Sequence, residues 1–367
     1  MYAGLSRVSA PRAASTATLA QGCAVGPPRT AAARTPRPAM KIAVVGCGAI
    51  GGYVGARLAL AGEAVTFMVR GANLEAVRRE GLTLIMNDGA RHSVRNVVAT
   101  ADYAAAGPQD LVILAVKAHQ LEAVASQVPR LCGADTVVVT MQNGIPYWYF
   151  HRHGGELAGT VVRSVDPHGL ISELIPPERV IGCVVYPAAE LLVPGVVRHI
   201  EGERFPVGEL DGTCSERVQR VSQCLTGAGF KAPVLGDIRA EIWLKLWGNL
   251  TFNPISALTR STLADICQYP ATRELAAAMM SEAQTIAHKL GIVFRVGLDK
   301  RIAGAEKVGQ HKTSMLQDVE AGRAPELEAL VGSVVELGRL THTHTPHIDA
   351  VYGLTQLLAR SLAAPHA

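Results

Sequence analysis

The chain has 367 residues, of which 49% are hydrophobic and 18% are charged, so it can bury a large core and should form about two domains. Its formal net charge is +4, without a basic cluster interleaved with aromatic residues, which argues against nucleic acid as a partner. No apolar run is long enough to span a bilayer, so we expect a soluble protein with no membrane partner. The seven cysteines are scattered without CxxC pairs, which favours reduced thiols and a cytoplasmic location.

Residues 1–39 differ in composition from the rest of the chain. They are rich in Ala, Pro, Ser and Thr, carry several arginines, and contain no Asp or Glu. Such a segment cannot supply a packed core, so we interpret it as a disordered extension or an over-long translation start. A transit peptide is the alternative, although the prolines interrupt an amphipathic helix.

The predicted fold begins at Met40 with a strand, a tight turn, a helix and a second strand. Residues 41–45 and 65–69 are the two strands, and a GxGxxG turn joins the first strand to the helix: Gly46, Cys47, Gly48, Ala49, Ile50 and Gly51. Gly46 permits a sharp exit from the strand, Gly48 lets the backbone approach a pyrophosphate, and Gly51 allows close helix–strand contact. The phosphates would meet N–H groups at a helix N-terminus. The context favours a dinucleotide site over an ordinary glycine-rich turn.

The end of the second strand indicates which dinucleotide binds. NAD-specific sites usually place Asp or Glu there to bind the ribose hydroxyls, whereas an arginine receives a 2′-phosphate. This strand ends in Val69-Arg70-Gly71, without a carboxylate. Arg70 therefore predicts NADPH as the cofactor; the alternative is a solvated arginine beside a loop.

Two further strands place polar residues at the same edge of the predicted sheet. A short helix is expected over residues 74–82, and strands over residues 111–116 and 136–140. Lys117 follows the first of these strands and Asn143 follows the second. Because ligands of open parallel sheets bind beyond the carboxyl ends of the strands, both residues should lie near the nicotinamide. The alternatives are a surface lysine and a turn asparagine.

The pattern then changes from strands to helices. Short strands at residues 180–186, 196–200 and 204–207 are separated by Pro and Gly, which suggests antiparallel strands appended to the parallel sheet. A helix is expected over residues 216–225, and only helical periodicity follows about residue 237. We predict an α/β Rossmann-type N-terminal domain over residues 40–236 and an all-α C-terminal domain over residues 237–367.

The second domain contains polar residues on an otherwise apolar helix. Lys245, Asn249 and Asn253 recur at i, i+4 and i+8 within residues 241–254, so they share one helical face. A cation and two amides there require partners, which a polar substrate or a core salt bridge could provide. Farther along, Ser314 and Asp318 share a helical face, and Glu326 begins another apolar helix. The closely spaced histidines lack carboxylate or thiolate ligands at helical spacing, so we predict no metal.

Several motifs in this order resemble one enzyme family. They are GCGAIGGYVGARLA with Arg70, VKAHQ, MQNG, EIWLKLWGNLTFNPISAL, and TSMLQDVEAGR followed by Glu326. From Met40 to about Leu358 the chain resembles 2-dehydropantoate 2-reductase, also called ketopantoate reductase. This resemblance implies NADPH-dependent reduction of 2-dehydropantoate to pantoate, a step of pantothenate and coenzyme A synthesis, in a cleft between the two domains.

The resemblance also implies roles for individual residues. The position of Lys245 is that of the catalytic acid, and Glu326 assists at the substrate. Asn249, Asn253 and Ser314 would bind the 2-oxo acid; Lys117, Asn143 and Glu326 would lie where cofactor and substrate meet; Arg70 would hold the 2′-phosphate; Asp318 would be structural. The alternatives are a reductase of another 2-oxo acid and a non-catalytic NADPH-binding regulator. A homodimer is left open.

Two segments depart from the usual pattern of the family. Members commonly read Arg-Pro-Thr-Glu where this chain has Arg323-Ala324-Pro325-Glu326, and residues 147–150 (YWYF) are unusually aromatic. Either change could reshape the acid pocket. At neutral pH a lysine is charged unless burial lowers its pKa, so we expect Lys245 to act as an acid without special tuning.

Overall fold

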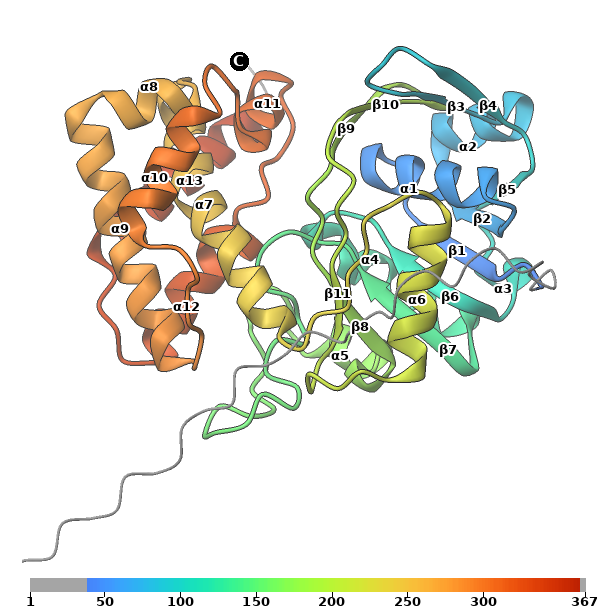
Figure 1. Ribbon diagram of the computed structural model, residues 1–367, viewed down its shortest axis with the longest axis horizontal. Coiled ribbons are helices and arrows are strands. Elements are labelled where there is room, and N and C mark those ends of the chain that lie inside the picture. Colours follow the sequence, from blue (N-terminus) through green and yellow to red (C-terminus); the bar gives the residue numbers. More distant parts are fainter. Residues whose placement is uncertain (1–37, 364–367) are drawn as a thin grey trace, which may run out of the picture.

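A computed structural model describes residues 38–363, and Figure 1 shows an α/β part beside a group of helices. The α/β part holds all the strands of the described chain, and the helical part begins with α7 (Ile238–Thr259). The predicted fold class is confirmed: a mostly parallel sheet with an appended antiparallel strand is followed by helices. The interpretation of residues 1–39 falls almost entirely outside the described residues.

The main sheet has seven strands in the order β11-β8-β7-β6-β1-β2-β5. In chain order they are β1 (Lys41–Val45), β2 (Ala64–Met68), β5 (Val97–Thr100), β6 (Gln109–Leu114), β7 (Cys132–Thr140), β8 (Val180–Cys183) and β11 (Val207–Glu209). All neighbours pair in parallel except β11, which is antiparallel to β8. The carboxyl ends of the central strands therefore meet at one edge, where the ligand crevice of such sheets lies.

A second sheet corrects the expected arrangement of the later strands. β3 (Leu82–Ile85), β4 (Arg91–Val94), β9 (Ala188–Val193) and β10 (Val196–Glu201) form a separate sheet in the order β4-β3-β10-β9. The sequence pattern predicts antiparallel additions to the main sheet. β11 is one, because it is antiparallel to β8, but β8 itself is parallel to β7, and β10 belongs to the second sheet. Strand pairing between segments about a hundred residues apart depends on tertiary packing, which local periodicity does not encode.

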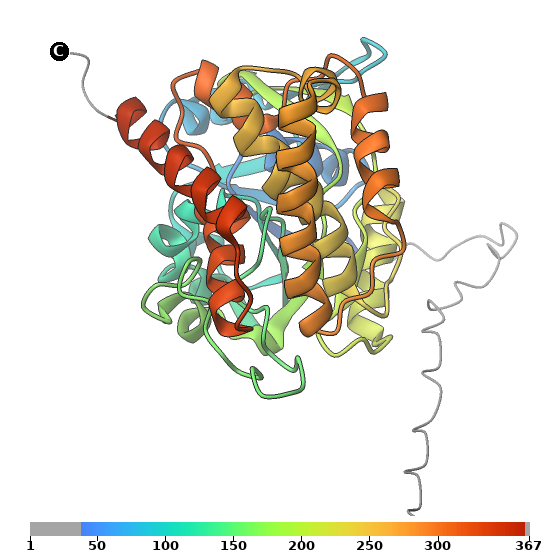
Figure 2. The ribbon, with the colours of Figure 1, turned by 90° about the vertical axis from the view of Figure 1, so that its left-hand side faces the viewer.

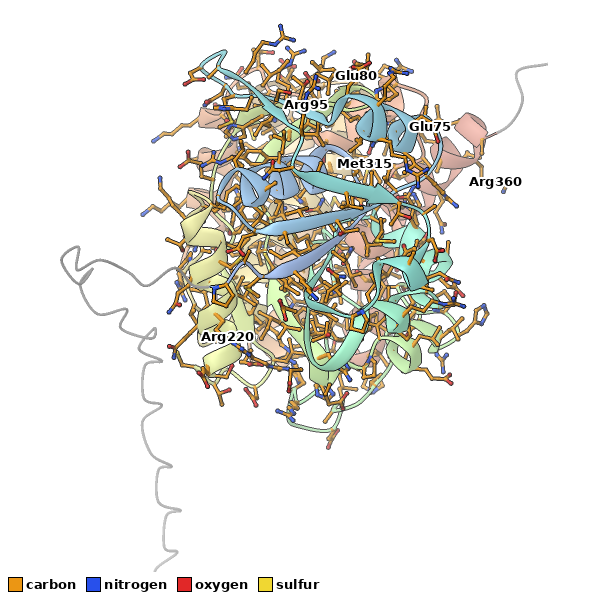
Figure 3. The ribbon with its side chains drawn as sticks, turned by 90° about the vertical axis from the view of Figure 1, so that its right-hand side faces the viewer. Glu75, Glu80, Arg95, Arg220, Met315 and Arg360 are labelled. Atoms are coloured by element: carbon orange, nitrogen blue, oxygen red, sulfur yellow. The ribbon has the colours of Figure 1, made fainter. Side chains whose placement is uncertain are left out.

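The two faces of the main sheet are buried by different elements. On β1, Ile42 and Val44 join a core with α1 (Ala49–Leu60), α6 (Glu216–Gly227) and the second sheet. Ala43 and Val45 point the other way, toward α4 (Leu121–Ala125) and α5 (Leu170–Leu174). Burial on both faces explains the continuous apolar strands of the sequence. Figure 3 views this part from the side opposite to the helical group, with Arg220 on α6 at one margin.

Short helical segments complete the α/β part. They are α2 (Gly71–Glu80), α3 (Tyr103–Ala106), η1 (Ala118–Gln120), η2 (Val128–Leu131) and η3 (Pro177–Arg179). α2 begins directly after Arg70, and η1 begins directly after Lys117. Both predicted cofactor residues therefore stand at the junction between a strand end and a helix start.

The helical part packs around α7 and α9 (Pro270–Lys289). Figure 2 shows the molecule with the helical part facing the viewer. The other elements are α8 (Leu263–Gln268), α10 (Leu298–Lys307), α11 (Ser314–Glu320), η4 (Glu328–Gly332), α12 (Ser333–Leu340) and α13 (Pro346–Ala363). Their apolar residues continue the core that contains α4 and α5, so the two parts share one buried interior.

Other general expectations have structural counterparts. Cys47, Cys132, Cys183 and Cys267 are free thiols, as predicted for these four. Within residues 38–363, none of the helices combines the length and apolar character that crossing a bilayer requires.

Candidate active site

The glycine turn lies between β1 and α1 with the geometry that its sequence predicts. Gly46 has a φ of 98°, a conformation that side chains other than glycine rarely adopt. A Cβ at Gly51 would lie 1.9 Å from the Gly46 carbonyl oxygen, so only glycine fits there. At Gly48, by contrast, a Cβ would find no atom of the described chain within 4 Å. The backbone is therefore open at Gly48, where a pyrophosphate could approach the start of α1.

The remaining features of the turn add space and shape rather than charge. α1 has no side-chain cap from the described residues, so its first N–H groups remain available to an anion. Cys47 is buried, and burial raises the pKa of its thiol to about 12, although a hydrogen bond from Asn73 opposes this. Cys47 is therefore a small packing residue and not a nucleophile.

Asn73 supports this turn and was missed in the sequence. Its side-chain amide donates to the Cys47 carbonyl, and its Oδ1 accepts from the Gly195 N–H at 2.7 Å. One side chain thus fixes the turn to the loop between β9 and β10. The only sequence signal is an amide in the first turn of the helix after Arg70, which is too common to single it out.

Arg70 lies two residues after the end of β2 and directly before α2. It is exposed, and among residues 38–363 it has no hydrogen-bond or ion-pair partner. Burial raises the pKa of the nearby Tyr103 phenol, and the positive charge of Arg70 opposes that increase. An arginine that is unpaired at this corner of the crevice is available to a 2′-phosphate.

α7 carries the principal polar face of the helical part. The Asp237 side chain caps its first turn by accepting from Ala240 N at 2.9 Å. Arg239 is buried and anchors the same end by donating to the carbonyls of Tyr149 and His151 at 2.8 and 2.5 Å, and to that of Leu210. These contacts fix α7 against the loops that follow β7 and β11.

Three predicted residues meet across the two parts of the molecule. Lys245 Nζ donates to Asn143 Oδ1 at 2.6 Å and to the Val185 carbonyl. Asn143 Nδ2 donates to Glu326 Oε2 at 3.4 Å, and Glu326 Oε1 accepts from the Ala118 N–H at 3.2 Å. A lysine, an amide and a carboxylate thus form one chain of hydrogen bonds at the carboxyl edge of the sheet.

The electrostatic setting of Lys245 differs from the expectation. Burial lowers its pKa to about 8, whereas the negative charge of Glu326 opposes that decrease. The ammonium remains the main form at neutral pH, but it releases a proton more readily than an exposed lysine. The site therefore tunes Lys245, which the sequence alone did not require.

The expected substrate residues lie on or beside the same helix. Asn249 lines a small cavity with Lys245 and Asn143, and Asn253 is buried one turn farther on. Ser314 is exposed at the first position of α11, a helix that packs against α7. None of these three side chains takes part in the hydrogen bonds that link Lys245, Asn143 and Glu326, so those bonds leave their polar groups unused.

Lys117 and Asp318 pair with each other across the domain junction. Their side chains form an ion pair of 2.7 Å, and Asp318 also accepts from Arg323 Nε at 2.9 Å. Asp318 therefore joins the two parts of the chain, which agrees with a structural role. Lys117 lies directly before Ala118, whose N–H donates to Glu326. Lys117 is therefore adjacent to the chain of hydrogen bonds that includes Lys245.

Comparison with known proteins decides the family. The family model for ketopantoate reductase PanE/ApbA matches residues 42–212, and its C-terminal counterpart matches residues 237–359. The chain belongs to the ketopantoate reductase family. Members are NAD(P)-dependent oxidoreductases, and the chain is an oxidoreductase of this kind.

Individual ketopantoate reductases agree over nearly their full length. A 2-dehydropantoate 2-reductase of Mesorhizobium japonicum is 54% identical over 321 residues, which cover 87% of this chain and 98% of that protein. One of Archaeoglobus fulgidus is 30% identical, covering 81% and 90%. A crystal structure assigned to ketopantoate reductases, from Ralstonia solanacearum MolK2, superimposes with a TM-score of 0.85 at 42% identity, covering 89% and 99% of the two chains.

The aromatic segment that departs from the ketopantoate reductase pattern has a clear structural role. Residues 147–150 are buried, and three of them bond to the surrounding core: Tyr147 to Ile175 O, Trp148 to Thr140, and Tyr149 to Trp243. Trp148 also lines the small cavity beside Lys245. The aromatic segment is thus mainly core, with one ring reaching the site.

The residues before Glu326 are held from both sides. Arg323 donates to Asp318, and the Leu327 N–H bonds to the Pro325 carbonyl at 3.0 Å. The altered segment over residues 323–326 therefore still presents its carboxylate to Asn143.

The histidines near the C-terminus have a contact of a different kind. His347 contacts Glu282 at 2.7 Å. Within the described chain no three metal-binding side chains gather, and the absence of a resident metal stays a prediction.

Proposed function

We propose that this chain reduces 2-dehydropantoate to pantoate with NADPH. The observation that carries the proposal is the hydrogen-bonded series of Lys245, Asn143 and Glu326, which stands at the carboxyl edge of the sheet, where a ketone could meet a nicotinamide. The identity of 54% to a 2-dehydropantoate 2-reductase supports the same substrate.

The proposed mechanism rests on charge at the ketone oxygen. NADPH, when bound, supplies the hydride that the ketone carbon accepts. Negative charge then develops on the ketone oxygen, and the Lys245 ammonium stabilises it and donates a proton, which yields the 2-hydroxy acid. Asn143 orients the ammonium, since its Oδ1 accepts from Nζ at 2.6 Å. Glu326 helps to keep Lys245 protonated by its negative charge.

Substrate and cofactor contacts follow from the remaining polar groups. We assign Asn249, Asn253 and Ser314 to the hydroxyl and carboxylate groups of the acid, because their side chains lie on or beside the Lys245 face of α7. Residues 46–51 would receive the pyrophosphate, and Lys117, Asn143 and Glu326 would stand where cofactor and substrate meet. In this assignment residues 40–236 bind the nucleotide and residues 237–367 supply the acid.

NADPH preference is assigned to Arg70, whose guanidinium is unpaired within the described chain. A bidentate guanidinium–phosphate contact contributes roughly 1.5 to 3 kcal/mol that NADH cannot realise. Arg70→Ala should therefore reduce the ratio of kcat/KM for NADPH to that for NADH about 10- to 100-fold. Arg91→Ala, which removes another exposed arginine, is the control. Equal kcat/KM for both cofactors in the unaltered protein would contradict the assignment.

The test of the substrate is a panel of 2-oxo acids assayed by loss of NADPH absorbance. The proposal expects 2-dehydropantoate to give the highest kcat/KM. A higher value for a bulkier 2-oxo acid would favour a reductase of that acid, for which Trp148 beside the cavity gives a reason. A D-mandelate dehydrogenase solved with NADH and anilino(oxo)acetate shares the fold, with a TM-score of 0.74 at 23% identity.

A regulator that binds NADPH without turnover would need only the glycine turn and Arg70. The connected series of Lys245, Asn143 and Glu326 argues against such a regulator, because nucleotide binding alone gives no reason for it. The absence of turnover on every acid of the panel would favour the regulator instead.

The oligomeric state is a separate proposal. A ketopantoate reductase of Staphylococcus aureus described as dimeric shares the fold, with a TM-score of 0.66 at 20% identity. We propose a homodimer here as well. The molar mass in solution, measured by light scattering, should be twice that of the chain, and a value equal to that of one chain would contradict the proposal.

A further inference from the structure

Arg301 is a second cation beside the polar face of α7. It projects from α10, and its guanidinium lies directly against the backbone of Gly248: a Cβ there would be 2.2 Å from Arg301 Nη2 and 3.1 Å from Cζ. Gly248 is three residues after Lys245 and immediately before Asn249. The glycine therefore leaves the space that the guanidinium fills.

Arg301 differs from the other shielded arginines of the protein. Those elsewhere in residues 38–363 that are at least half-buried donate hydrogen bonds to described residues: Arg57, Arg179, Arg204, Arg217, Arg239 and Arg273. Arg301 is half-buried and has no such bond or ion pair to any residue of that range. A shielded guanidinium without an acceptor is costly unless a ligand supplies one.

The position of Arg301 connects it to the catalytic lysine. Tyr186 lies close enough to Arg301 to oppose the lowering of the Arg301 pKa by burial, and the Tyr186 ring centre lies 6.0 Å from Lys245 Nζ. Tyr186 itself is held by its hydroxyl, which donates to Glu241 at 2.7 Å. Lys245 and Arg301 are thus both neighbours of one ring. The Glu241 carboxylate accepts from Tyr186 and Arg204, and within residues 38–363 it has no bond to Arg301.

We propose that Arg301 binds the carboxylate of the 2-oxo acid and so selects acids over neutral ketones. The inference rests on the proposed function, since it assigns one group of that substrate. A planar guanidinium can donate two parallel hydrogen bonds to a carboxylate, which a lysine cannot reproduce. In a 2-oxo acid the carboxylate is bonded to the ketone carbon. When Lys245 contacts the ketone oxygen, a cation on one side of Lys245, such as Arg301, would therefore meet the carboxylate. Burial lowers the pKa of Arg301 without removing its charge.

The test compares a carboxylate with its neutral counterpart. Arg301→Met keeps the stem of the side chain and removes the charge. It should raise KM for 2-dehydropantoate and the inhibition constant of pantoate about 10- to 100-fold, with a smaller change in kcat. The inhibition constant of pantolactone should change less than about twofold, because pantolactone lacks the free carboxylate and forms no ion pair with Arg301. Lys300→Met, an exposed cation on the same helix, is the matched control and should change neither.

A second variant displaces the guanidinium without deleting it. Gly248→Ala puts a methyl carbon 2.2 Å from the present position of Arg301 Nη2, so the flexible end of the arginine must move. It should raise KM for the acid in the same direction while the melting temperature is kept, because alanine favours a helix. Arg301→Lys should restore less than the full affinity, since it lacks the planar pair of donors.

The outcomes separate this inference from the proposed function. An unchanged KM in Arg301→Met, or equal weakening of pantoate and pantolactone, overturns the role of Arg301. If the unaltered protein does not reduce 2-dehydropantoate, the proposed substrate is wrong; the best acid of the panel and its methyl ester then replace the pair, and the same comparison decides Arg301. Melting temperature and NADPH affinity, measured for each variant, should stay unchanged; a loss of both with KM would mark Arg301 as structural and overturn the inference.

Discussion

Lys245 is subject to two opposing effects that together suit an acid catalyst. Burial lowers its pKa and the Glu326 charge raises it, with a resulting value of about 8. At pH 7 the ammonium is still the main form, so the proton is present when the ketone oxygen becomes negative. A surface lysine would hold that proton more tightly and orient it less well.

Replacement of Lys245 tests this role directly. Lys245→Ala should reduce kcat by about 10² to 10⁴, the usual range for loss of a positioned proton donor. NADPH affinity should change little, because the phosphate contacts lie at the glycine turn. Steady-state kinetics and a binding titration measure the two quantities, with the exposed Lys307→Ala as control. A near-normal kcat of Lys245→Ala, measured with the best substrate of the 2-oxo acid panel, would show that Lys245 is structural and not the catalytic acid.

The pH dependence of the reaction has a defined direction. A group that must be protonated loses activity as pH rises through its pKa, so kcat/KM should fall above about pH 8, the approximate pKa of Lys245. Glu326→Gln removes the charge that raises this pKa, so the decline should begin at lower pH. The profile is measured from about pH 6 to 10 with both proteins. A decline that moved to higher pH in Glu326→Gln would show that another group titrates.

At the scale of elements, α7 is fixed by its first turn. Arg239 donates to three backbone carbonyls on two different loops, while Asp237 caps the helix. A carbonyl that loses its donor inside the protein is not compensated by water. The position of Lys245, about two turns farther along, therefore depends on these loops.

Replacement of Arg239 tests this anchor. Arg239→Met should reduce the free energy of unfolding by about 2 to 4 kcal/mol, because it leaves buried carbonyls without donors. Urea titration measures the effect. Arg220→Met on α6 removes an exposed arginine, which Figure 3 shows at the surface, and should change stability by less than about 0.5 kcal/mol. Similar stability of the two variants would mean that Arg239 does not anchor α7.

At the scale of the whole molecule, several contacts hold the α/β part against the helices. Besides the Lys117–Asp318 pair, the Ile145 N–H bonds to the Ala329 carbonyl at 2.9 Å. Glu336 on α12 accepts from the N–H groups of Arg163 and Ser164, both at 2.7 Å, and from the Ser164 hydroxyl at 2.6 Å. One carboxylate thus secures the long loop after β7.

Glu336→Ala should weaken this junction, since it removes three hydrogen bonds to a charged acceptor. We expect a loss of about 1.5 to 3 kcal/mol in unfolding free energy. Urea unfolding followed by tryptophan fluorescence measures it, with Glu75→Ala, an exposed residue of α2 seen in Figure 3, as control. An unchanged midpoint would show that the loop is held by its apolar contacts alone.

The sequence by itself determined the local units. Apolar runs predicted the buried strands of the main sheet, the glycine spacing predicted the turn before α1, and the i, i+4, i+8 spacing placed Lys245, Asn249 and Asn253 on one face. These features depend on neighbours within one or two turns, so periodicity and backbone sterics suffice to find them.

Only the tertiary structure decided which of these residues meet. Lys245 contacts Asn143 across 102 positions, Asn143 contacts Glu326 across 183, and Lys117 contacts Asp318 across 201. The second sheet, the support from Asn73, the lowered pKa of Lys245 and the setting of Arg301 likewise arise from packing between distant segments. Burial and charge at a site are sums over everything that surrounds it, and a linear pattern does not contain that sum.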